Sequence, residues 1–185
     1  MDLRINENAM YLIKYAKINS IKITPILQNI ATKLNINLYG LKYCIKDFRE
    51  IYFKINNNRI IDDALRYTFI ISDNQNFQNI VNKVNYILNK NNIYLIKTKN
   101  YFCDNYRYKA FHQIYSYNNF IFEIQFHTNL SIKVSEKLKT LYKKYKKLLS
   151  KLFLNDRIQG IPGSEDPGYS RTDRFCLGWS LRKTL

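Results

Sequence analysis

Two adjacent carboxylates near the middle of the chain could take part in phosphate chemistry. Asp62 and Asp63 stand directly before the stretch 64–71 (ALRYTFII), whose composition favours a β-strand. Carboxylates at the end of a strand commonly bind Mg²⁺, an ion that prefers oxygen ligands and keeps several bound waters. The pair could equally cap an element of secondary structure, and this motif alone leaves both interpretations open.

Basic residues recur in the segment before these carboxylates. The segment 46–57 contains Lys46, Arg49 and Lys54, and its apolar residues predict a helix. Helical spacing would place the two lysines on one face, two turns apart, with Arg49 beside them. Such a face could bind a polyphosphate along its length, although a solvated basic face has the same pattern.

A third segment combines aromatic and imidazole side chains. In a predicted strand over 108–117, Tyr108, Ala110 and His112 would share one face. A small residue between an aromatic ring and an imidazole leaves room for a flat base to stack. The alternative is a plain Tyr-rich strand in a chain that contains 16 tyrosines.

A fourth segment alternates apolar and polar residues over 122–128. The predicted core-facing set is Phe122, Ile124 and Phe126, and the polar set is Glu123, Gln125 and His127. Glu123 gains a role if it converges with Asp63, because two carboxylates from separate strands can divide metal binding and proton acceptance between them. A half-exposed antiparallel strand would show the same alternation.

The periodicity along the chain predicts the elements that position these residues. Helices are expected at 7–19, 24–36, 46–57, 75–90 and 130–153, and strands at 37–43, 64–71, 93–99, 108–117 and 120–127. Thr24 and Pro25 predict a helix start as N-cap and first helical residue, and Asn118-Asn119 predicts a hairpin turn. This order predicts an α+β (mixed α/β) domain whose mixed sheet of about five strands is flanked by helices.

Composition limits the class of protein. The chain has 185 residues, 46% of them hydrophobic, which is enough for one domain with a core. A net charge of +16 attracts phosphates, whether of a free nucleotide, an RNA or a membrane. The three cysteines are dispersed, and the sequence has neither an apolar leader nor an apolar run of roughly 18 residues. We therefore expect a cytoplasmic protein, or one that is exported without such a leader.

Taken together, the four segments resemble the synthetase domain of the RelA/SpoT family. Segment 46–54 (KDFREIYFK) is similar to its ATP-binding helix motif K-x-x-x-S-I-x-x-K, and 62–66 (DDALR) to its metal-binding Asp before G-I-R. Segments 107–112 (RYKAFH) and 123–128 (EIQFHT) resemble G-Y-x-S-L-H and E-L-Q-I-R-T. Their order and spacing agree over roughly 23–150, and the DALRYT and EIQFHT forms look closer to the relatives found in bacterial toxins and effectors.

The resemblance implies a role for each residue. The ATP-binding residues would be Lys46, Arg49, Lys54 and Arg66; the metal ligands Asp63, Asp62 and Glu123; and the acceptor-binding residues Tyr108, His112, Gln125 and His127. Asp63 and Glu123 would be catalytic, and Mg²⁺ would be the cofactor. The domain would span 23–155, after a helical extension at 1–22 and before a disordered or foreign tail at 156–185.

The family resemblance also implies a reaction. It is the Mg²⁺-dependent transfer of pyrophosphate from ATP to the 3′-hydroxyl of a guanosine or other purine nucleotide, as in (p)ppGpp synthesis during the stringent response. Pyrophosphorylation of a tRNA end is one alternative. A non-catalytic remnant that binds nucleotide or RNA is another, because Glu50, Arg107 and His127 replace the Ser, Gly and Arg of the family motifs.

The predicted last helix carries most of the basic surface. Residues 131–151 contain eight lysines and one glutamate, which keeps RNA as a possible partner. We expect an apolar side of this helix to pack inward, namely Leu141, Tyr142, Tyr145 and Leu148. A membrane-surface or protein-interaction role for the helix is a third alternative, and the sequence leaves the oligomeric state open.

Overall fold

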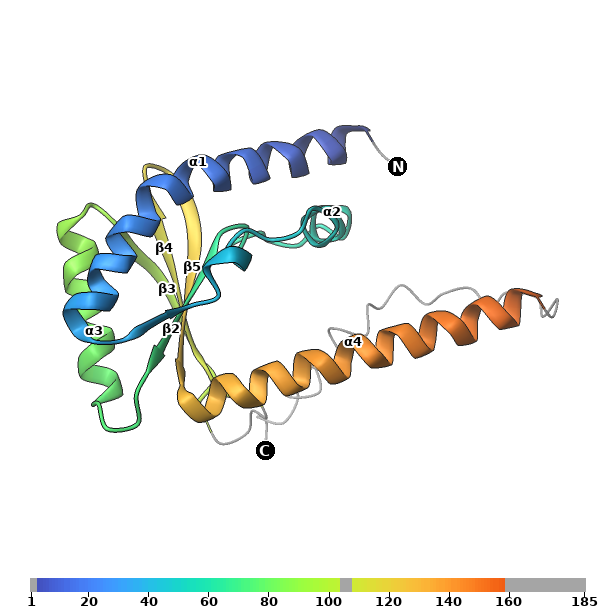
Figure 1. Ribbon diagram of the computed structural model, residues 1–185. Coiled ribbons are helices and arrows are strands. Elements are labelled where there is room, and N and C mark those ends of the chain that lie inside the picture. Colours follow the sequence, from blue (N-terminus) through green and yellow to red (C-terminus); the bar gives the residue numbers. More distant parts are fainter. Residues whose placement is uncertain (1–2, 104–107, 159–185) are drawn as a thin grey trace, which may run out of the picture.

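The structure, a computed structural model, describes residues 3–103 and 108–158, and side chains up to residue 148 apart from 142, 143, 146 and 147 (Figure 1). The helices are α1 (Leu3–Leu34), α2 (Phe48–Asn56), α3 (Phe77–Lys90) and α4 (Asn129–Ile158), with a short 3₁₀ helix at Leu41–Tyr43. The strands are β1 (Asn37–Tyr39), β2 (Arg66–Ile71), β3 (Tyr94–Asn100), β4 (Phe111–Tyr117) and β5 (Phe120–Thr128). Arg107, the side chain of Tyr142 and the predicted tail after residue 158 lie outside the described residues.

The strands form one mixed sheet in the order β1-β2-β5-β4-β3. β2 and β5 are parallel neighbours, and the other pairs are antiparallel. This arrangement confirms the predicted α+β fold with a five-stranded mixed sheet. The parallel register sets Arg66 opposite Glu123, so the loop that enters β2 lies beside the polar residues of β5.

The hydrophobic core fills the space between the sheet and the helices α1 and α3, which cover one side of it (Figure 1). The fully buried aromatic side chains of this core are Tyr67, Phe69, Tyr115, Phe122 and Phe126. The predicted alternation of β5 is confirmed, but its polar side is buried as well. Glu123, Gln125 and His127 are only 5%, 6% and 1% exposed, which excludes a half-exposed strand.

The predicted helix break at Pro25 is wrong. A single helix, α1, runs from Leu3 to Leu34 with Pro25 inside it. Pro25 is exposed, whereas Ile23, Leu27 and Ile30 form a fully buried stripe whose packing on the sheet keeps the helix continuous. Instead of capping a helix, the Thr24 hydroxyl makes a hydrogen bond of 2.7 Å with the Tyr67 hydroxyl. The boundary predicted between residues 22 and 23 therefore falls inside α1.

The Asn118-Asn119 hairpin prediction is confirmed. These residues join β4 to β5 with φ angles of 48° and 61°, which asparagine tolerates better than most residues. The strand predicted at 37–43 is shorter than expected. Gly40, at φ 68°, turns the chain out of β1 into the 3₁₀ helix.

The inward packing predicted for α4 is wrong. Leu141, Tyr145 and Leu148 are 60%, 47% and 60% exposed. Only the first turns of α4 contact the sheet, through the buried Ser131 and neighbouring residues, and the rest of the helix extends away from it (Figure 1). Amphipathic periodicity predicted the apolar stripe but could not show that nothing in the described chain covers it.

Candidate active site

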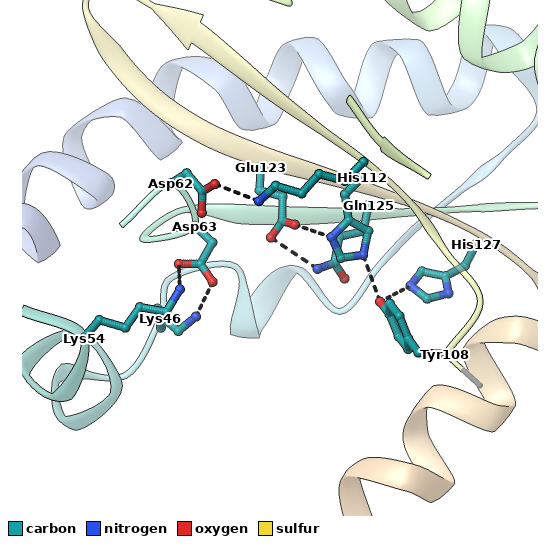
Figure 2. Close-up of polar contacts among 10 residues, drawn as sticks. Lys46, Lys54, Asp62, Asp63, Tyr108, His112, Glu123, Gln125 and His127 are labelled. Carbon is teal, nitrogen blue, oxygen red and sulfur yellow. Dashed lines mark hydrogen bonds and ion pairs between the residues drawn. The ribbon is translucent and has the colours of Figure 1, made fainter. Parts of the chain in front are cut away.

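Two lysines bind one buried carboxylate at the entrance to β2. Lys54 donates a hydrogen bond of 2.8 Å to one oxygen of Asp63, and Lys46 donates a short one to the other (Figure 2). Asp63 is 8% exposed. Burial alone would raise its pKa, but the two ammonium groups outweigh burial and lower it. Glu50 lies 3.8 Å from Lys46 on the solvent side of this cluster.

Lys46 is not part of a helix, contrary to the prediction. Asp47 is the N-cap of α2, and its side chain accepts a hydrogen bond of 2.8 Å from the Arg49 backbone N–H. Lys46 therefore precedes α2, and its own N–H donates to the Ala64 carbonyl at 3.0 Å. The two lysines still meet, but a strand-like contact positions Lys46 and a helix positions Lys54. Arg49 is exposed in the first turn of α2.

Lys99 is a site residue that the sequence interpretation missed. It lies on β3, opposite His112 of β4, and donates a hydrogen bond of 2.9 Å to Asp62. Burial lowers the pKa of Lys99, but the Asp62 carboxylate more than compensates and Glu123 adds to the same effect, so the pKa is raised. The ammonium of Lys99 thus interacts electrostatically with the carboxylates of both Asp62 and Glu123. Its position in a strand with a second lysine, Lys97, was the only signal in the sequence.

Both oxygens of Glu123 are held by neighbouring side chains. His112 Nδ1 lies 2.5 Å from one oxygen, and Gln125 Nε2 donates to the other at 3.2 Å (Figure 2). His112 and Gln125 face each other across β4 and β5. The sheet therefore fixes the orientation of this carboxylate, as a proton acceptor in a reaction would require.

A chain of hydrogen bonds continues from this carboxylate to α4. The Tyr108 hydroxyl lies 2.9 Å from His112 Nε2 and 3.3 Å from His127 Nε2. His127 Nδ1 is 3.0 Å from the Ser131 hydroxyl. Ser131 was not predicted as a site residue, although it lies only four residues after His127. Because α4 begins directly after β5, its first turn places the Ser131 hydroxyl beside the imidazole.

Tyr108 does not lie in a strand, contrary to the prediction, because β4 begins at Phe111. Its ring meets the His112 ring edge to face, with centroids 5.7 Å apart and planes at 86°. The predicted gap for a base between these two rings is therefore absent. Ala110, expected to leave that gap, is fully buried.

The side chains of His127 and Tyr108 are uncharged near neutral pH. Burial lowers the pKa of His127 to about 4, and the positive charges of His112, Lys139 and Arg66 act in the same direction. Burial also raises the pKa of the Tyr108 hydroxyl, with a further contribution from Glu123. Arg66 is half-buried at the start of β2, and its charge acts to lower the pKa of both Tyr108 and His127.

The predicted metal ligands do not form a metal cage. Within residues 3–103 and 108–158, no group of three or more His, Cys, Asp or Glu side chains is arranged to hold a metal ion. Asp62 and Asp63 are paired with lysines, and Glu123 with His112. The donors nevertheless suit Mg²⁺, because this ion usually binds to one or two carboxylates together with substrate phosphates.

A hollow of about 320 Å³ lies away from these residues. Its lining residues are Phe77, Gln78, Asn100, Phe102, Phe111 and Thr128. Phe111 and Thr128 alternate with His112 and His127 along their strands, so their side chains point to the opposite face of the sheet. We place the candidate active site on the polar face, because that face gathers the buried charged groups.

The fold of this chain has a counterpart among solved structures. It is similar to the crystal structure of small alarmone synthetase 1 from Bacillus subtilis, with a TM-score of 0.55, 15% identity, and coverage of 76% of this chain and 79% of that chain. At this identity the similarity establishes the fold. No family model and no curated protein matches the sequence. None of the helices in the described part of the chain is long and apolar enough to span a membrane.

Proposed function

We propose that this protein transfers pyrophosphate from ATP to the 3′-hydroxyl of a purine nucleotide. One observation carries the proposal: two buried carboxylates, Asp63 and Glu123, occupy the same face of the sheet (Figure 2). The parallel pairing of β2 and β5 sets Arg66, which follows Asp63 closely in the chain, opposite Glu123. The fold shared with a small alarmone synthetase supports the same class of reaction.

The proposed reaction is a single displacement at phosphorus. The acceptor oxygen O3′ attacks the β-phosphorus of ATP, the bond from that phosphorus to the α-β bridging oxygen breaks, and AMP leaves. Glu123 accepts the proton of the hydroxyl while His112 and Gln125 hold its two oxygens in place. Most of the rate would come from positioning and charge neutralisation.

Lys46 and Lys54 would bind the triphosphate of ATP. Both ammonium groups already converge on one point, the carboxylate of Asp63. A phosphate oxygen offers the same charge-assisted hydrogen bonds. Asp63, with Asp62 beside it, would then be the carboxylate available to hold Mg²⁺, whose charge neutralises the charge that develops on the transferred group.

Glu123→Gln tests the base. With ATP labelled at the γ-phosphate, Mg²⁺ and GDP, GTP, ATP or tRNA as acceptor, the variant should lose at least about 100-fold in transfer rate while its affinity for ATP stays the same. Glu136→Gln is the matched control, because Glu136 is an exposed carboxylate that accepts a hydrogen bond from Tyr39 and from none of the candidate active-site residues. If the wild type transfers no label to any acceptor where a known synthetase does, the proposal is wrong.

Asp63→Asn tests the lysine pair. Removing the carboxylate frees both ammonium groups, so ATP should bind more tightly without Mg²⁺, by about tenfold if one charge-assisted contact is gained. The Mg²⁺-dependent turnover should be lost in the same variant. An unchanged ATP affinity in Mg²⁺-free buffer would show that the lysines serve only to neutralise Asp63.

A non-catalytic nucleotide-binding protein is the second candidate. The observation that favours it is that Asp62, Asp63 and Glu123 each already have a cationic or histidine partner. Such a protein would bind ATP with the same lysines but give no labelled product with any acceptor. A tRNA end remains the alternative acceptor. Changing Lys143, Lys144, Lys146 and Lys147 together to Glu should abolish tRNA binding if that alternative is right.

A further inference from the structure

The distal part of α4 carries a regular apolar seam that nothing in the described chain covers. The seam comprises Val134, Leu138, Leu141, Tyr145 and Leu148, which are between 38% and 60% exposed. Their spacing alternates between four and three residues. This is the a/d repeat of a helix that packs against another helix as a coiled coil.

The position of α4 makes this seam available. Ser131, Ile132 and Ser135 are buried against the sheet, and Glu136 accepts a hydrogen bond from the Tyr39 hydroxyl of β1. From Ser135 to Ile158 the helix extends away from the sheet (Figure 1), over roughly 34 Å at 1.5 Å per residue. A helix of this length in water gains most of its stability from packing, so the seam indicates a partner.

The width of the seam favours a partner helix over a membrane. Between Val134 and Leu148, Tyr142 is the one apolar residue outside the a and d positions. The g positions beside the seam are the exposed Lys137 and Lys144. A helix that lies in a bilayer surface has a broader apolar face with aromatic and aliphatic residues across it. A strict a/d stripe is the narrower seam of a coiled coil.

The charge of α4 argues against a second copy of this chain as the partner. Residues 131–151 contain eight lysines and one glutamate, a net charge of 8 − 1 = +7. Two such helices packed 8–10 Å apart would repel each other. Acidic residues opposite Lys137 and Lys144 would instead form the pairs that set partner choice in coiled coils.

We propose that α4, from Val134 to Leu148, binds an acidic amphipathic helix of a partner protein. The apolar residues of the partner pack into the seam, and its Glu or Asp side chains lie against Lys137 and Lys144. This inference does not depend on the proposed function, because none of the seam residues is among the candidate active-site residues.

The test uses three labelled synthetic peptides of three heptads each and the full-length protein. The first has Leu at a and d with Glu at e and g, the second has the same composition in scrambled order, and the third has Lys in place of Glu. In fluorescence anisotropy, the first peptide should bind at least about tenfold more tightly than the other two. Leu141→Asp or Leu148→Asp should weaken this binding at least about tenfold. Ile21→Asp, at a still more exposed apolar site on α1, should leave it unchanged.

Three results would overturn the proposal. The first is equal binding of ordered and scrambled acidic peptides, which would show attraction by charge alone. The second is a dimer or larger oligomer in sedimentation that Leu141→Asp dissolves, which would make a second copy the occupant. The third is binding to phosphatidylglycerol vesicles that Leu141→Asp abolishes, which would make the seam a membrane contact. Far-UV circular dichroism confirms that each variant is folded, because the changed side chains are exposed.

Discussion

Stability should fall steeply in mild acid because of one buried histidine. His127 is 1% exposed, its Nδ1 lies 3.0 Å from the Ser131 hydroxyl, and its Nε2 lies 3.3 Å from the Tyr108 hydroxyl. Its pKa is lowered from 6.5 to about 4, first by burial and then by the neighbouring positive charges. The folded protein therefore resists protonation at a site that the unfolded chain protonates readily.

The sign and size of the effect follow from linkage. Between pH 6.5 and pH 4 the unfolded state binds more protons at this site than the folded state, so the stabilising contribution is complete above pH 6.5 and is lost as the pH falls. A shift of about 2.5 units corresponds to about 3 kcal/mol at 1.36 kcal/mol per unit. Between pH 7.5 and pH 5, about 2 kcal/mol of this should be lost.

The assay is urea unfolding followed by circular dichroism at pH 7.5, 6 and 5, for the wild type and His127→Gln. The variant starts from a lower stability because it loses the hydrogen bonds of the imidazole, but it has no proton to gain at this position. Its stability should fall by about 2 kcal/mol less than that of the wild type over the same pH range. Other groups titrate in both proteins and cancel in the comparison. Equal losses in the two proteins would refute the reasoning.

Three further predictions concern local structure, each measured as a change in the urea midpoint at constant slope. Pro25→Ala should stabilise the protein by up to about 3 kcal/mol, because it restores a helical N–H inside α1; no gain would mean that the fold requires the proline at this point of α1. Asn119→Gly should stabilise by up to about 1 kcal/mol, because its φ of 61° suits glycine better; a loss would contradict the turn geometry. Asp47→Ala should destabilise by about 1 kcal/mol through loss of the α2 N-cap; an unchanged midpoint would show that packing alone holds the end of α2.

Local patterns predicted the parts of the fold that depend on local physics. The alternation of Phe122, Ile124 and Phe126 gave the core side of β5, and the positive φ angles of Asn118 and Asn119 confirmed the turn between β4 and β5. These features depend on side-chain period and on backbone sterics, which neighbouring residues determine. These local features predict the pairing of β4 with β5 but not the full strand order, because pairing between strands that are distant in sequence depends on tertiary contacts.

The wrong or missed predictions have two physical origins. Pro25 was taken as a helix start because its intrinsic preference points that way, but the buried stripe on α1 outweighs that preference. Lys99 was missed because its link to Asp62 joins residues 37 positions apart. Lys46 was given the wrong element because Asp47 is the better N-cap. In each case a contact made elsewhere in the fold, or a competing local preference, decided the outcome.

The lysines around Asp63 couple two events in the proposed reaction. Both oxygens of Asp63 are bound by ammonium groups, and a phosphate that takes over these hydrogen bonds displaces the carboxylate. The displaced carboxylate is buried, and a buried charge without a partner is strongly unfavourable. A divalent cation arriving with the triphosphate would supply that partner at the same moment. From this exchange we infer that ATP without Mg²⁺ binds weakly to the wild type, and that the ion pairs at rest keep the site from binding phosphate alone.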